Sequence, residues 1–244
     1  MSAISPFLRP FYAMLKPAGA ACNLSCRYCY YTEKAALYPG APRVMGYGLL
    51  DDFTRQYIEA QPGRQVLFTW HGGEPLLRPM SFYRRALELQ RRYARGRHVD
   101  NCLQTNGTLL TDEWCSFFRD EGFLIGISID GPRRLHDPLR QGSFDRVMRG
   151  IALLEKHGVE WNAMATVNSL NAPHPAEFYR FFKSIGCRYL QFTPVVERTS
   201  HVPGRLMAGG EPGWQLTPES VTPAAWGAFA CGVFDEWVRA DVGR

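Results

Sequence analysis

The chain has 244 residues, of which 45% are hydrophobic and 21% charged, and this ordinary composition excludes disordered, collagen-like and disulfide-scaffold proteins. No apolar run reaches the roughly 20 residues of a membrane helix, and Arg9 and Pro10 interrupt the N-terminal apolar stretch, so we expect a cytoplasmic protein without a membrane segment. The net charge of +5 is spread along the chain and does not by itself indicate a nucleic-acid partner.

Short apolar runs alternate along the chain with longer stretches of helical periodicity, which is the pattern of βα units around a parallel sheet. Apolar residues recur at core spacing in helices that begin near Phe82, Phe144 and Phe178, and a last helix is expected over 223–238. The stretch 196–219 shows no period and is expected to be a lid or a disordered insert. The predicted strands are 12–16, 65–70, 99–104, 124–129, 160–167 and 188–193.

Capping residues mark the predicted helix ends. Thr111 and Ser143 stand where N-caps are expected, and Gly122, Gly158 and Gly186 follow the last apolar turns of three helices. Because crossovers between parallel strands are right-handed, six such units curl into a partial or complete barrel. We therefore predict an α/β fold of this kind.

Three cysteines follow the first predicted strand, at the edge where parallel sheets place their ligand sites. Cys22, Cys26 and Cys29 have the spacing C-x3-C-x2-C. Three thiolates suit a soft metal, and a four-iron four-sulfur (4Fe-4S) cluster held by them keeps one iron open. Zinc is the alternative, although no histidine lies within five residues of the three cysteines. The other cysteines are predicted to be small buried side chains: Cys102, Cys115, Cys187 and Cys231.

Polar segments also follow the next three predicted strands. Residues 71–75, His-Gly-Gly-Glu-Pro, offer two glycines through which the backbone can approach a ligand closely, although Gly-Gly alone fits a turn. Residues 104–107, Gln-Thr-Asn-Gly, also fit a turn. Ser128 is a candidate ligand because its isoleucine neighbours point to the opposite face, whereas Asp130 fits a turn cap equally well.

Together these motifs resemble those of the radical S-adenosylmethionine (SAM) superfamily, and within it those of the anaerobic sulfatase-maturating enzymes. The resemblance runs from about Met14 to Glu197. It implies a partial (β/α)6 TIM-like barrel of the radical SAM type. The most specific segments are 70–75, 103–109, 126–132 and the pair Gln191 and Phe192.

The resemblance also implies site residues, cofactors and partners. The cluster ligands are expected at Cys22, Cys26 and Cys29 of a 4Fe-4S cluster, with SAM as the second cofactor. The expected activity is oxidation of a sulfatase Cys or Ser to formylglycine by a 5′-deoxyadenosyl radical, with flavodoxin or ferredoxin as reductant. SAM contacts are expected at Tyr28, Gly72, Gly73, Glu74, Ser128, Arg140 and Val196, although Arg140 also fits a surface arginine.

The chain departs from the family at its C-terminus. Members continue into a domain with two further clusters, and the expected base lies beyond their last barrel helix, so we expect 1–244 to be one truncated core domain without a catalytic residue of its own. Two other functions remain open: a radical SAM peptide maturase that forms thioethers or crosslinks, and a zinc-binding nucleic-acid module. The arginines of 78–97 mostly lie opposite an apolar stripe, which favours a solvated helix over a nucleic-acid surface.

Overall fold

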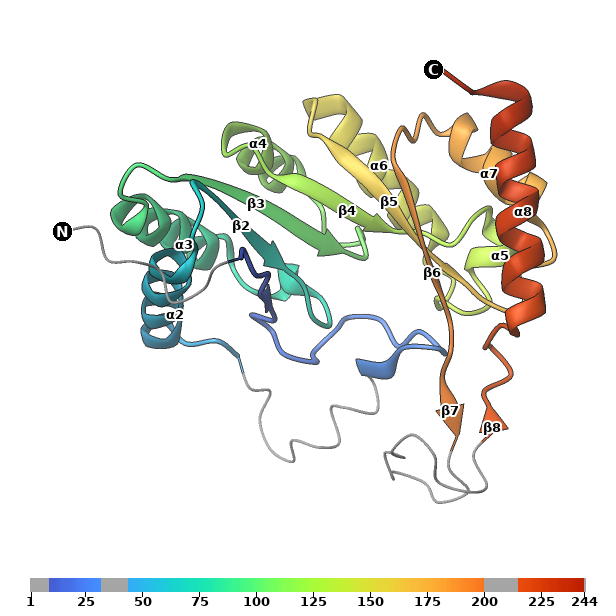
Figure 1. Cartoon of the computed structure of the whole chain (residues 1–244), viewed down its shortest axis with the longest axis horizontal. Helices are drawn as coiled ribbons and strands as arrows, with labels where there is room; N and C mark the ends of the chain where they lie inside the picture. Colours follow the sequence, from blue (N-terminus) through green and yellow to red (C-terminus); the bar gives the residue numbers. More distant parts are fainter. Residues whose placement is uncertain (1–8, 32–43, 200–214, 244) are drawn as a thin grey trace.

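The computed structural model of the chain describes residues 9–31, 44–199 and 215–243. Its centre is a six-stranded parallel sheet in the order β1-β2-β3-β4-β5-β6 (Figure 1). Each strand pairs with the next in sequence, so the crossovers share one hand and the sheet curls into a half-barrel. The predicted partial barrel is confirmed. The strands are β1 Met14–Leu15, β2 Gln65–Trp70, β3 His98–Thr105, β4 Leu124–Ser128, β5 Trp161–Val167 and β6 Leu190–Pro194.

Helices connect these strands and pack on one side of the sheet (Figure 1). The sequence patterns did not predict α2, because its buried face of Leu50, Thr54, Tyr57 and Ile58 includes a polar residue that interrupts the apolar period. The helices are α2 Tyr47–Ala60, α3 Met80–Tyr93, α4 Asp112–Asp120, α5 Arg133–His136, α6 Phe144–His157, α7 Pro175–Ser184 and α8 Pro223–Ala240, with a short 3-10 turn η1 Pro75–Leu77.

The two faces of the sheet differ in burial. In β5, Ala163 and Ala165 are buried, whereas Met164 and Thr166, which alternate with them, are only partly buried. Because side chains alternate along a strand, the first pair faces the helices and the second faces the inside of the half-barrel. This inner surface, called the open face below, is where the barrel leaves room for ligands.

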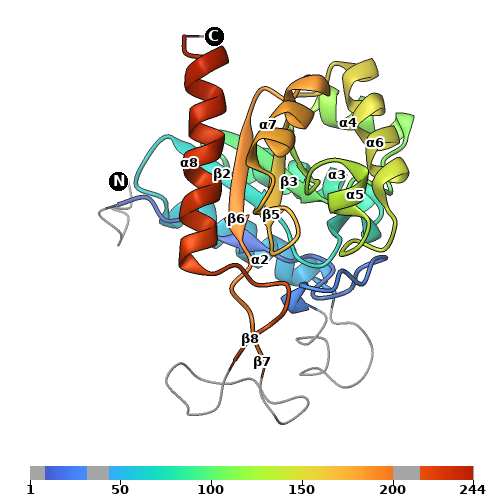
Figure 2. The ribbon, with the colours of Figure 1, turned by 90° about the vertical axis from the view of Figure 1, so that its right-hand side faces the viewer.

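The last helix covers the edge of the sheet. Figure 2 shows α8 running alongside β6. The ring of Phe229 packs 5.1 Å from that of Phe178 in α7 and 5.6 Å from that of Phe192 in β6. Most of the expected insert, 200–214, lies outside the described residues, and its two ends pair as β7 Arg198–Thr199 and β8 Gln215–Leu216.

The predicted caps are confirmed with one exception. Thr111 accepts a hydrogen bond from the main chain of Trp114, and Gly158 closes α6 with a left-handed φ of 65°. Ser143 stands at the N-cap position of α6, but its hydroxyl bonds to the ring of His136 instead of capping the helix. In the part of the chain that the structure describes, no helix is long and apolar enough to cross a membrane.

Candidate functional site

The three cysteines lie on an irregular loop, residues 20–31, called the cysteine loop below. It lies near the carboxyl ends of the strands (Figure 1). The end of β3 holds one side of it, because Asn106 Nδ2 donates to Asn23 Oδ1 over 2.9 Å. Asn23 Nδ2 in turn donates to Thr108 Oγ1 over 2.9 Å.

The connection between β4 and α6 holds the other side of the cysteine loop. The main-chain nitrogen of Ser25 donates to Gln141 Oε1 over 2.8 Å, and that of Arg27 donates to the carbonyl of Leu139 over 2.9 Å. Arg27 also forms a 2.7 Å ion pair with Glu219, just before α8. Segments distant in sequence therefore fix a loop that has no regular structure of its own.

The three thiols differ in their surroundings. Cys22 is exposed, and its sulfur accepts hydrogen bonds from Leu24 N at 3.4 Å and Asn106 Nδ2 at 3.7 Å. Cys26 and Cys29 are half-buried, and burial raises the pKa of the Cys26 thiol to about 11. Three thiols with N–H donors at one sulfur form a donor set that fits an iron-sulfur cluster. Within the described ranges, no three His, Cys, Asp or Glu side chains are arranged to hold a single metal ion.

The other cysteines agree only in part with their predicted burial. Cys115 is fully buried, whereas Cys102 and Cys187 are half-buried. Cys231 is exposed, so its prediction as a buried side chain is wrong. It lies on α8 two residues before the buried Val233, on a face that turns away from the sheet.

The two glycines after β2 pack directly against the cysteine loop. Gly73 N donates to the carbonyl of Gly19, and Glu74 N donates to that of Ala21. A Cβ on Gly73 would lie 2.1 Å from Ala21 O and 2.6 Å from Ala20 O. The sequence suggested that glycine is needed for the approach of a ligand, but the structure also requires it for the approach of the cysteine loop itself.

Glu74 is fully buried and connects the ends of β2 and β3. Its Oε1 accepts from Leu76 N and Thr105 Oγ1, and its Oε2 accepts from Asn106 N, all within 2.9 Å. Burial raises the pKa of this carboxyl to about 7, although the three donors favour its charged form. Because both carboxylate oxygens already accept hydrogen bonds from the protein, Glu74 would contact SAM through its main-chain atoms.

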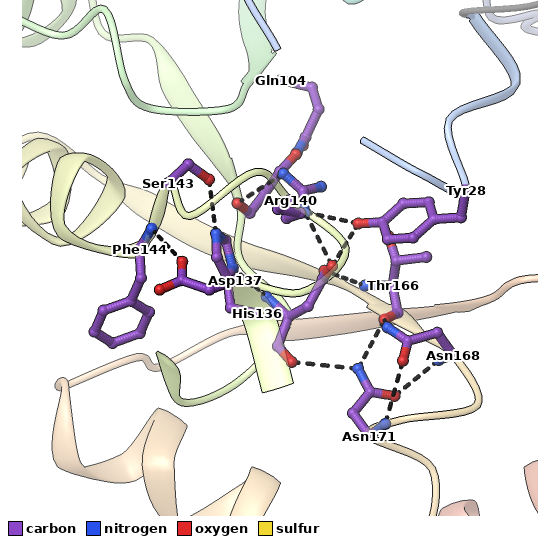
Figure 3. A network of polar contacts seen from close by, with 12 residues as sticks. Tyr28, Gln104, His136, Asp137, Arg140, Ser143, Phe144, Thr166, Asn168 and Asn171 are labelled. Atoms are coloured by element: carbon purple, nitrogen blue, oxygen red, sulfur yellow. Dashed lines mark hydrogen bonds and ion pairs between the residues drawn. The ribbon is translucent and has the colours of Figure 1, made fainter. Parts of the chain in front are cut away.

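A buried group of three side chains lies beside the cysteine loop (Figure 3). Arg140 Nε donates to Asp130 Oδ2 at 2.9 Å and to Tyr28 Oη at 2.6 Å, and the Tyr28 hydroxyl bonds to the same carboxylate oxygen. Asp130 Oδ1 accepts from the main chain of Thr166 in β5. Asp130 is fully buried and Arg140 is 7% exposed, so Arg140 is not a surface residue and Asp130 is more than a turn cap.

Further polar residues extend this network, and the sequence analysis did not assign them. His136 Nδ1 accepts from Asp130 N, and its Nε2 bonds to Ser143 Oγ at 2.9 Å. Burial lowers the pKa of His136 to about 4. Asn171 Nδ2 donates to the carbonyls of Asp130 and Thr166 (Figure 3). No sequence pattern signals these contacts, because they depend on the irregular path of the chain after β4 and β5.

The remaining predicted contacts lie at the ends of β4 and β6. Ser128 ends β4 on the open face, where its Oγ accepts from Gln104 Nε2 at 2.8 Å. Val196 follows β6 and is 56% exposed. The structure thus brings Tyr28, Ser128 and Arg140 together, while Gly73 joins the opposite side of the cysteine loop and Val196 lies at the last strand.

Fold and sequence together define the class of this protein. The family model of the radical SAM superfamily matches residues 17–182. The chain belongs to this superfamily, whose cofactors are SAM and a 4Fe-4S cluster.

Relatives of the chain include anaerobic sulfatase-maturating enzymes of two types. The chain is 57% identical to the serine-type anaerobic sulfatase-maturating enzyme of Bacteroides thetaiotaomicron, over 98% of the chain and 60% of the relative. It is 41% identical to the serine-type enzyme of Klebsiella aerogenes, over 96% of the chain and 56% of the relative. It is 32% identical to the cysteine-type enzyme of Clostridium novyi, over 93% of the chain and 59% of the relative.

Solved structures agree with these relatives. The structure of native anSMEcpe with bound AdoMet and Cp18Cys peptide superposes with a TM-score of 0.80 at 30% identity, over 94% of this chain and 60% of that one. The chain spans about 60% of the length of these relatives.

Proposed function

We propose that the chain forms the radical SAM part of an anaerobic sulfatase-maturating enzyme of the serine type, which converts a sulfatase serine to formylglycine. The observation that carries the proposal is the cysteine loop, which hydrogen bonds place against the ends of β3 and β4, beside the open face. The serine type is favoured because identity is 57% and 41% to two serine-type enzymes and 32% to a cysteine-type enzyme.

Cys22, Cys26 and Cys29 would hold the cluster, and Gly73, Ser128 and Arg140 would lie nearest to SAM. When bound, these cofactors would supply a 5′-deoxyadenosyl radical that removes hydrogen from the β-carbon of the target residue. The Asp130 carboxylate holds Arg140 in one orientation through the 2.9 Å ion pair. The exposed side chains of Gln191 and Thr193 leave a polar surface on which a sulfatase peptide would lie.

The same site would need an electron donor, and flavodoxin or ferredoxin is the class of protein that we expect. A nucleic-acid partner is not favoured. Three of the seven arginines in residues 78–97 are paired with carboxylates: Arg85 with Glu88, Arg91 with Glu121 and Arg95 with Glu59. These pairs reduce the positive charge that this surface could offer to a phosphate backbone.

Anaerobic reconstitution tests the proposal. The chain should bind iron and acid-labile sulfide and release 5′-deoxyadenosine when it is reduced in the presence of SAM. A serine-type sulfatase peptide is added so that any product formed on it can be identified by mass spectrometry. Cys22→Ala should lose most of the iron, and the matched variant Cys102→Ala should keep it. One zinc per chain, with no 5′-deoxyadenosine released, would overturn the proposal in favour of a zinc module.

The peptide products separate the two enzyme functions. Formylglycine on the serine peptide supports sulfatase maturation. A thioether or another crosslink, with no formylglycine, would show that the chain belongs to a different peptide maturase.

A further inference from the structure

The side chain of Gln104 reaches along the open face from β3 to the end of β4. We propose that Gln104 is a positioning residue, which turns the hydroxyl of Ser128 so that its hydrogen is donated to an acceptor atom of SAM. This inference rests on the proposed function, because it concerns the same cofactor. It gives Gln104 a role and fixes which way the Ser128 hydroxyl points its hydrogen, and the family motifs assign neither.

Both oxygen atoms of Ser128 accept hydrogen bonds from the protein. Gln104 Nε2 donates to Ser128 Oγ at 2.8 Å, and Arg140 Nη1 donates to the main-chain carbonyl at 3.3 Å (Figure 3). A serine hydroxyl has a single hydrogen. Among residues 9–31, 44–199 and 215–243, the Ser128 hydroxyl accepts from Gln104 and donates to no other group. The hydrogen is therefore available to a ligand on the open face.

A glycine makes this arrangement possible. Gln104 pairs with Gly126 across β3 and β4, and Ser128 follows two residues later on the same face of the sheet. A Cβ on Gly126 would lie 2.0 Å from Gln104 Oε1. Gln104 therefore lies over the bare backbone of Gly126 on its way to Ser128, and any larger residue would move it away.

The direction of the hydrogen bond restricts the ligand group at Ser128. Since Gln104 donates to Oγ, the hydroxyl can direct its hydrogen outward at an oxygen or nitrogen acceptor. The carboxylate, the ribose oxygens and the adenine nitrogens of SAM are such acceptors. Its ammonium group is a donor and does not match. Ser128 would thus contact one of the acceptor groups of SAM and not its ammonium group.

SAM affinity, measured by equilibrium dialysis of the reconstituted protein without oxygen, tests this assignment. Gln104→Met keeps the length but removes the donor, so the hydroxyl rotates freely and the Kd should rise about tenfold. Gln104→Glu offers a carboxylate that takes the Ser128 hydrogen for itself, and the Kd should rise more than in Gln104→Met. Gly126→Ala displaces Gln104 and should raise the Kd for SAM by about the same factor as Gln104→Met.

Combining the variants separates positioning from general damage. Gly126→Ala and Gln104→Met act through one hydrogen bond, so the double variant should bind SAM no more weakly than either single variant. Gln65→Glu makes the same change of residue at the exposed first position of β2 and should leave the Kd within about twofold of the parent. Thermal unfolding and iron content should stay at parent values in all of these variants.

Three results would overturn the assignment: an unchanged Kd in Gln104→Met, a loss of SAM affinity in Gln65→Glu equal to that in Gln104→Glu, or additive effects in the double variant. If SAM binds the parent and Gln104→Met equally, only this inference is lost. If the iron-loaded parent binds no SAM, the proposed function itself is lost, and this inference with it.

Discussion

Two neighbouring segments form the candidate site, and they are stabilised in opposite ways. The cysteine loop has an exposed Cys22 and is held mainly by bonds to other segments. The connection between β4 and α6, residues 129–143, instead contains buried polar groups: Asp130, His136, Arg140 and Ser143 are at most 7% exposed.

This difference teaches how the site can be both accessible and ordered. Thiols that bind a cluster next to a ligand must face the open side of the barrel, so the cysteine loop cannot have a core of its own. Its order comes from the rigid connection beside it, through the contacts at Leu139, Arg140 and Gln141. Substitutions that disrupt the connection should therefore also disorder the cysteine loop, whereas similar substitutions elsewhere on the surface should not.

The largest expected effect follows from breaking the buried ion pair. Asp130→Asn leaves the Arg140 guanidinium buried without its counter-charge, and we expect a loss of roughly 3 to 5 kcal/mol in the free energy of unfolding. Urea unfolding of the metal-free protein measures this loss. Asp145→Asn, which breaks the exposed pair with Arg133, is the matched control and should leave the free energy of unfolding nearly unchanged. Equal losses in the two variants would contradict the rigidity assigned to the connection.

The next effect is smaller and acts from the opposite side of the cysteine loop. Gly73→Ala places a Cβ against the carbonyls of Ala20 and Ala21, and because backbone atoms yield poorly, we expect a cost of about 3 kcal/mol. Cluster loading should fall together with SAM binding, since the loop itself is displaced. Gly63→Ala, whose Cβ meets only one atom at 4.0 Å, is the control. A variant that loads iron fully but binds SAM weakly would show that Gly73 serves the ligand alone.

The connection should also give the protein a specific sensitivity to acid. His136 has a pKa lowered by burial to about 4, below the usual 6.5, so the unfolded chain binds a proton more readily than the folded protein. Stability from the neutral ring is fully present above pH 6.5 and is lost as the pH falls towards 4, by about 3 kcal/mol in total.

His136→Gln should remove this part of the pH dependence, as measured by urea unfolding between pH 4 and 7. Glu74, whose raised pKa acts in the opposite direction, is present in both proteins, so their difference isolates His136. If His136→Gln kept the parent's dependence of the unfolding free energy on pH, the assignment of this dependence to His136 would be contradicted.

The sequence predicted the sheet better than the site, for physical reasons. Six apolar runs and their order were enough for the half-barrel, because parallel strands joined by helices have few alternative topologies. The motif at Cys22 was visible because its spacing is local. The partners of Asp130 were not visible, because His136 and Arg140 reach it through the irregular fold of the connection 129–143 and Thr166 reaches it from the neighbouring strand β5.

The smallest expected effect gives the sharpest separation between the two segments. Gln141 adopts a left-handed φ of 55°, unusual for a residue with a side chain, while its Oε1 accepts from Ser25 N in the cysteine loop. Gln141→Gly relieves the backbone strain but loses this hydrogen bond. These contributions nearly cancel, so the free energy of unfolding should change by about 1 kcal/mol or less.

The cysteine loop, however, loses one of its fixed points in Gln141→Gly. Iron release to a chelator without oxygen should therefore become about fivefold faster, as expected for one lost hydrogen bond of about 1 kcal/mol. Arg95→Gly is the matched control, because Arg95 is the other residue with a side chain and a positive φ in the described chain, at 47°, and its side chain pairs with Glu59 of α2 and not with the cysteine loop. It should change stability by a similar amount and leave iron release at the parent rate. Faster release in both variants would mean that strain relief, and not the lost contact with Ser25, loosens the cluster site.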